Sequence, residues 1–168
     1  MIYKKALIFS LLILTACTNT PNLTINESIP SSTYSGRGTN AGPMLVGALG
    51  ATGLAVGLAI DQGIAKDFDR KIEQYKSVYL HNISKKLSKN HANTTHISLE
   101  RIKFTAVKRN DNLVNATVTF KLAEKSSYSN IELALKKIDF EALKSTPIFW
   151  EELLKVNLLC KNEVLSEE

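Results

Sequence analysis

The sequence lacks the motifs by which most enzymes are identified. It contains no nucleophile elbow, no glycine loop of the type that cradles phosphate and no paired-carboxylate signature. His91 and His96 lie in a His-x4-His spacing with Glu100 nearby, but nothing fixes a third ligand, so we interpret these residues and His81 as solvated. We therefore expect no enzymatic activity, no catalytic residues, no metal ion and no dissociable cofactor.

The chain also lacks a large excess of charge of either sign. Lys and Arg total 21 against 16 Asp and Glu, which gives a formal net charge of +5. Without the first sixteen residues, which include Lys4 and Lys5, the net charge falls to +3. This excess is too small to indicate a nucleic-acid partner, and it is compatible with an anionic lipid surface.

Cysteine is scarce, and the first of the two cysteines follows a segment typical of exported proteins. Lys4 and Lys5 precede a short apolar core, Ala6–Leu14, which is too short to span a bilayer. The core runs directly into Leu14-Thr15-Ala16-Cys17. In position, core length and sequence, this tetrapeptide resembles the lipobox of bacterial lipoproteins.

The resemblance implies that residues 1–16 are a signal peptide cleaved before Cys17. It also implies diacylglycerol on the sulfur of Cys17 and an acyl chain on its amino group, which together suffice for stable membrane anchoring. Thr18, in place of Asp, implies the outer membrane by resemblance to enterobacterial sorting, so the location we expect is the cell envelope, facing the periplasm or the cell surface.

Cys160 would be the only thiol left after lipidation, so no intramolecular disulfide would be possible. It is either buried and free or an intermolecular bridge in an oxidising periplasm. We favour the buried thiol.

Residues 17–41 are expected to form a flexible tether behind the lipid. Between residues 18 and 41 the chain is rich in Ser, Thr, Asn, Pro and Gly. Few apolar residues are available there to offset the entropy lost on ordering.

Residues 42–60 form an apolar segment in which Thr52 is the only polar side chain. Nineteen such residues reach the length of a membrane helix. Four glycines recur at intervals of three, three and four residues: Gly47, Gly50, Gly53 and Gly57. At helical spacing they form a groove of bare backbone on one face, against which another helix can pack closely.

The helix is expected to continue as an amphipathic segment from about Met44 to about Lys89. Gly57 and Tyr75 are eighteen residues apart, which is five full turns, so the glycine groove and the later apolar stripe share one face. The opposite face of the second half is rich in Lys and Arg. We interpret it as a solvated face, and the alternative is a basic helix near anionic headgroups.

The period then changes from helical to alternating. Val114 to Leu122 alternate as a half-buried strand, and the alternation before them slips at Glu100-Arg101 as it would at a bulge. Turn residues at 109–112 separate the two segments, so residues 97–123 predict an antiparallel β-hairpin.

Residues 130–144 are ambiguous. Their spacing, with a capping box at Ser129 and Glu132, favours a helix, but Ile138 to Ala142 alternate and would suit a third strand. We favour the helix. Thr146-Pro147 predicts the start of a further helix, in which Trp150 and its apolar neighbours belong to the core.

These expectations give an α+β fold: a long N-terminal helix, then a β-hairpin and one or two further helices or a third strand. The segments are the signal peptide (1–16), lipidated Cys17 with the tether (17–41), the glycine-zipper segment (42–60) and a small α+β domain (61–168). Lipobox, polar tether and glycine segment together resemble the glycine-zipper outer-membrane lipoproteins of Gram-negative bacteria.

The resemblance implies a membrane-anchored envelope lipoprotein with a structural or assembly role, in contact with membrane lipid. Its zipper would pack against a second copy or another envelope protein, and nucleic acid is not an expected partner. The alternative is a periplasmic or surface binding module, for example of conjugation or secretion machinery, whose apolar helix packs on its own domain.

Overall fold

The computed structural model describes residues 23–91, 93–124 and 127–156. Two short strands come first, β1 (Thr24–Ile25) and β2 (Thr33–Ser35), followed by the helices α1 (Arg37–Leu49) and α2 (Ala51–Asn90). Three long strands follow, β3 (His96–Val107), β4 (Asn110–Ala123) and β5 (Tyr128–Asp139). The described part ends with α3 (Phe140–Ser145) and α4 (Ile148–Lys155).

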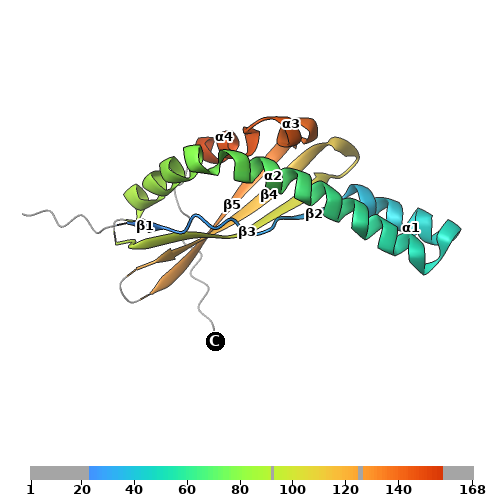
Figure 1. Cartoon of the computed structure of the whole chain (residues 1–168), viewed down its shortest axis with the longest axis horizontal. Helices are drawn as coiled ribbons and strands as arrows, with labels where there is room; N and C mark the ends of the chain where they lie inside the picture. The colour runs from blue at the N-terminus through green and yellow to red at the C-terminus, as the bar shows by residue number, and fades with distance from the viewer. Residues whose placement is uncertain (1–22, 92, 125–126, 157–168) are drawn as a thin grey trace, which may run out of the picture.

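The strands form one mixed sheet in the order β1-β3-β4-β5, with β2 also paired to β3. β3, β4 and β5 are antiparallel to their neighbours, whereas β1 and β2 run parallel to β3. α2, α3 and α4 lie over one face of this sheet (Figure 1). The alternating pattern of β4 turns its apolar side chains toward these helices, where Val114, Val118, Phe120 and Leu122 are fully buried.

The core between helices and sheet is built around aromatic rings. Phe68 of α2 packs edge-to-face on Phe104 of β3 and on Phe140 of α3, with ring centroids 4.9 Å and 5.5 Å apart. The indole N–H of Trp150 donates a hydrogen bond to the backbone oxygen of Ile72 over 3.0 Å, which fixes α4 to α2. The expected helix start near Pro147 and the expected core position of Trp150 are confirmed.

The expected β-hairpin at 97–123 is present as β3 and β4. Its register shifts between Leu99 and Arg101, where the sequence predicted a bulge. The two strands are joined by Lys108 and Arg109.

The expected fold class is nevertheless wrong in two respects. The long helix is not N-terminal and does not begin at Met44: α1 comes first and contains Pro43, and the chain turns at Gly50 before α2 starts at Ala51. The sheet is also larger than a hairpin, because three further strands join it. Gly50 has a φ of 61°, a conformation that interrupts a right-handed helix and that glycine adopts without strain.

Residues 128–139 form a strand, so the helix favoured for residues 130–144 is wrong for residues 130–139. Only from Phe140, where α3 begins, is the chain helical. A bulge explains the misleading pattern. Val114 pairs with Ile138 and Ala116 with Leu135, so Asn115 faces the two residues Lys136 and Lys137. The bulge puts an interval of three into an alternating strand and thereby mimics a helix.

The described part of the expected tether is also ordered. β1 and β2 lie along β3, and α1 already begins at Arg37. Leu23 and Ile29 pack against the core. Residues 23–41 therefore belong to the folded unit, and residues 17–22 lie outside the described residues.

The two ends of α2 hold different parts of the molecule. β1 pairs with His96, just beyond the C-terminal end of α2, whereas α1 packs on its N-terminal end (Figure 1). The 40 residues of α2 extend over about 60 Å at 1.5 Å per residue. In the ranges that the structure describes, no helix is both long enough and apolar enough to cross a membrane.

Candidate functional site

The most unusual feature of the structure is a pair of apolar helices, which we call the apolar hairpin and define as residues 37–61. It consists of α1, the turn at Gly50 and the first eleven residues of α2, and it projects beyond the sheet (Figure 1). No residue between Arg37 and Asp61 is charged. This segment therefore differs in composition from the rest of the folded unit.

The inner faces of the hairpin are packed backbone to backbone. A Cβ atom placed on Gly57 would overlap the backbone oxygen of Gly38, and one placed on Gly53 would overlap the backbone of Leu45. Gly42 is more loosely packed, since its Cβ would lie 3.8 Å from Leu54. The helices approach closely because these positions carry no side chain.

Gly50, which forms the turn, has both of its polar backbone groups hydrogen-bonded. Gly50 donates its N–H to the oxygen of Val46 over 2.8 Å, and its own oxygen accepts from Gly53 N over 3.0 Å. A single residue therefore joins the helices, and both of its polar backbone groups are bonded within the hairpin.

At the base of the hairpin, Asp61 caps α1 from the neighbouring helix. Its carboxylate accepts the backbone N–H groups of Gly36, Gly38 and Thr39 over 3.2, 2.7 and 2.9 Å, and also the Thr39 hydroxyl. α1 has no acidic residue in its own first turn, so Asp61 supplies the negative charge that a helix N-terminus favours.

The environment of Asp61 acts on its pKa in two opposing ways. Burial alone raises the pKa of the carboxyl, but the hydrogen bonds from Thr39, Gly38 and Gly36 outweigh burial and hold the pKa below its ordinary value of 3.8. Asp61 is 3% exposed. It is therefore a buried carboxylate that stays charged at neutral pH.

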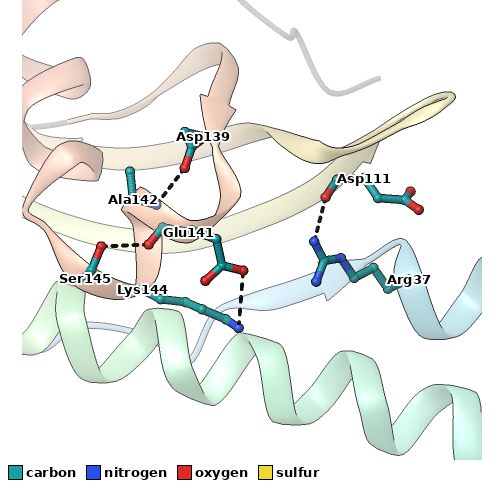
Figure 2. Close-up of polar contacts among 7 residues, drawn as sticks. All are labelled: Arg37, Asp111, Asp139, Glu141, Ala142, Lys144 and Ser145. Carbon is teal, nitrogen blue, oxygen red and sulfur yellow. Dashed lines mark hydrogen bonds and ion pairs between the residues drawn. The ribbon is translucent and has the colours of Figure 1, made fainter.

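Arg37, the first residue of α1, fixes the base to the rest of the fold (Figure 2). Its guanidinium lies 3.6 Å from the centre of the Phe140 ring and donates to the backbone oxygen of Asp111 over 2.9 Å. Phe140 begins α3, whose N-terminus is capped by the Asp139 carboxylate on Ala142 N. α1 is thus attached both to α3 and to the start of β4.

The outer surface of the hairpin is apolar on both sides. Among the described residues, eight large apolar side chains are exposed, and six of them belong to the hairpin, at exposed fractions from 40% to 82%: Met44, Leu49, Leu54, Val56, Leu58 and Ile60. On α2, successive residues are 100° apart. Leu54 and Leu58 therefore lie on one flank of the glycine stripe, and Val56 and Ile60 lie on the other.

Two of the four predicted packing glycines carry the helix contact. Gly53 and Gly57 pack against α1, whereas a Cβ on Gly47 or Gly50 would meet no atom within 4 Å. The groove is occupied by the chain's own α1 rather than being open along one continuous helix, as the sequence predicted. Cys17 and Cys160 lie outside the described residues.

The sequence reading missed the partner of the groove, namely Gly38 and Gly42 on α1, and the cap at Asp61. The signal was present, because Gly38 and Gly42 are four residues apart, but Gly38 was assigned to the tether by its polar surroundings and Gly42 to the start of the apolar segment. In the described ranges, no cluster of three or more His, Cys, Asp or Glu residues is placed to hold a metal ion.

Comparison with known proteins adds no relative: no protein-family model, no curated protein and no solved structure matches the chain.

Proposed function

We propose that this protein is a lipid-anchored lipoprotein of the bacterial outer membrane with a structural or assembly role, and that its apolar hairpin enters one leaflet of a lipid bilayer. The observation that carries the proposal is the apolar surface on both flanks of a hairpin that has no charged residue between Arg37 and Asp61. Exposed patches of this kind mark membrane or protein contacts.

Lipid explains the two flanks better than a protein partner does. A second protein that packs on one side of the hairpin would cover either Leu54 and Leu58 or Val56 and Ile60. The other flank would stay in water. Lipid surrounds an inserted hairpin and covers both flanks, which is why an element that is apolar on all sides is typical of a membrane.

The dimensions also fit one leaflet. The 13 residues of α1 extend over about 19 Å at 1.5 Å per residue. Half of a bilayer of about 40 Å, headgroup regions included, is about 20 Å, so a hairpin with its base among the headgroups would reach the middle of the bilayer without crossing it. The bonded turn at Gly50 would then lie at the greatest depth.

The proposed role in assembly is supported by this geometry. A hairpin in lipid would leave the sheet and its covering helices outside the bilayer, where they present a folded surface to other envelope components. We propose no catalysis, no metal or dissociable cofactor and no nucleic-acid partner.

The second candidate is a periplasmic or surface binding module whose apolar segment packs within its own chain. The contacts of Gly53 and Gly57 with α1 favour it, because they occupy the glycine groove. It gives no account of the six apolar side chains that stay exposed.

The test is the depth of a probe on the hairpin in the lipidated protein, reconstituted in vesicles. Leu54→Cys carries nitrobenzoxadiazole, in a Cys160→Ser background in which lipidated Cys17 is unreactive. Val78→Cys is the matched control, because Val78 is 61% exposed on the same helix but lies outside the hairpin.

We expect the probe at residue 54 to emit at shorter wavelength than the probe at residue 78 and to be quenched by lipids with a spin label on the acyl chain. Equal emission and equal quenching at the two positions would contradict insertion and favour the binding module.

A further inference from the structure

We infer that Lys108 and Arg109 bind anionic lipid headgroups and so select the leaflet that the apolar hairpin enters. The inference rests on the proposed function and specifies the lipid surface that the hairpin enters. It concerns the turn between β3 and β4, which we call the basic turn and define as residues 108–109.

The basic turn lies beside the base of the hairpin. Arg37 begins α1 and donates to the oxygen of Asp111, two residues beyond the turn, over 2.9 Å (Figure 2). In Figure 1 this turn lies at the end of the sheet nearest α1. A hairpin buried to its base would therefore bring the two cations to the level of the headgroups.

Neither cation is occupied within the folded unit. Lys108 and Arg109 are exposed, and across the described ranges neither side chain has an ion pair or a hydrogen bond. Asp111 is the only acidic residue between 107 and 112. The turn is thus a local excess of positive charge with its donors free.

Arg109 also has an unfavourable backbone conformation. Its φ is 65°, in the left-handed region that favours glycine or asparagine at such turns. An arginine in this conformation costs stability that a glycine would not, and residues held in such conformations gather at functional positions. The strained backbone at Arg109 therefore supports a functional role for the arginine side chain.

The basic face that the sequence indicated on α2 is less suitable for this role. Two of its cations are paired with acids on the same helix, Arg70 with Asp67 and Lys76 with Glu73. The face also extends away from the hairpin toward the far end of α2.

The test follows entry of the hairpin into vesicles of defined composition. The full lipidated chain, with the probe at Leu54→Cys and Cys160→Ser, is anchored in neutral phosphatidylcholine nanodiscs. These are titrated with vesicles of phosphatidylcholine alone or with 30% phosphatidylglycerol. The test variant is Lys108→Ala with Arg109→Gly, in which glycine suits the backbone and protects the fold.

The control variant is Lys85→Ala with Lys89→Ala, which removes the same charge from exposed positions at the far end of α2. Each basic residue near an anionic surface changes affinity by about fivefold, so we expect the test variant to bind anionic vesicles roughly 25-fold more weakly. Its affinity for neutral vesicles stays within about twofold of the parent, and the control changes little on either vesicle. Added salt weakens only the anionic preference.

The failures are distinguishable. If the parent protein binds neutral and anionic vesicles equally, or if both variants lose the same affinity, the headgroup inference is wrong and the proposed function stands. If the probe emits as it does in water, both in the nanodiscs alone and after either vesicle is added, insertion itself is wrong. A probe response that rises with protein concentration without vesicles assigns the hairpin to a second copy and overturns both.

Discussion

Gly57 of α2 packs directly on Gly38 of α1, backbone against backbone. Each is placed so that an added Cβ would overlap the backbone oxygen of the other. This contact holds the two helices of the apolar hairpin together and leaves their larger side chains on the outside.

Gly57→Ala is therefore expected to loosen the hairpin by about 1–3 kcal/mol, because its methyl group has no space. Gly47→Ala is the matched control: its methyl group meets no atom within 4 Å, and alanine favours the helix by up to about 1 kcal/mol. Amide hydrogen exchange across residues 51–60 measures both. Equal protection in the two variants would show that the glycine contact does not hold the helices.

Asp61→Asn is expected to weaken the attachment of α1 by roughly 2 kcal/mol at neutral pH, because hydrogen bonds to a charged acceptor become neutral ones. Asp67→Asn, which removes one partner of a surface ion pair, should cost less than about 1 kcal/mol. Thermal unfolding and amide exchange of α1 at neutral pH compare the two variants.

The pH dependence has a defined sign. The pKa of Asp61 is lower in the folded protein than its ordinary value of 3.8, so the folded state binds fewer protons and its stability falls on acidification. The contribution is complete above that value and is lost as the pH falls through the depressed pKa. Asp61→Asn should lack this acid-side loss, and an unchanged profile would show that another group causes it.

Arg37→Gln is expected to lower the stability of the hairpin base by about 1–2 kcal/mol, through loss of the cation on Phe140 and of the charged donor to Asp111. Lys144→Gln, whose ammonium lies farther from the same ring at 4.7 Å, should change stability by less than about 0.5 kcal/mol. Denaturant unfolding compares them. A larger effect at Lys144 would contradict the role of Arg37.

Much of the fold could be read from the sequence where the pattern is local. The β3–β4 pair follows from alternation and turn residues, and α4 follows from Pro147 and the apolar spacing after it. The continuous phase from Gly57 to Tyr75 correctly places both residues on one helix, since α2 contains them both.

The apolar hairpin could not be predicted from the sequence, because a stripe of glycines does not show which helix packs against it. The glycine spacing indicates that another helix packs closely on this face. The same spacing suits a helix of a second chain and the chain's own α1. Pro43 lies inside α1, although proline normally begins or breaks a helix.

The other errors have similar causes. β1 and β2 comprise two and three residues, too few for any periodicity, and they pair with a strand some 70 residues away. The bulge at Lys136–Lys137 disguised β5. Asp61 was one acid among several, and only the folded structure places it at the N-terminus of α1.

Lipidation of Cys17 would put the acyl chains at the opposite end of the molecule from the hairpin. Six residues from Cys17 to Leu23 reach about 20 Å at most, whereas α2 extends over about 60 Å. A hairpin inserted to its base and the lipid would then occupy two bilayers.

We therefore expect the lipidated protein to cluster vesicles, measured by light scattering, and Leu54→Asp with Leu58→Asp to abolish clustering. Insertion without clustering would instead place the long axis of the molecule along a single bilayer.

The most direct test of the central claim is the collision accessibility of nitroxides on the two flanks of the hairpin, at Leu54→Cys and Val56→Cys, in vesicles. Lipid on both flanks predicts that oxygen reaches both labels more readily than a water-soluble nickel chelate does. Access of the nickel chelate to both labels, or immobilisation and spin–spin broadening on one flank alone, would contradict it, because water or a second protein would then cover that surface.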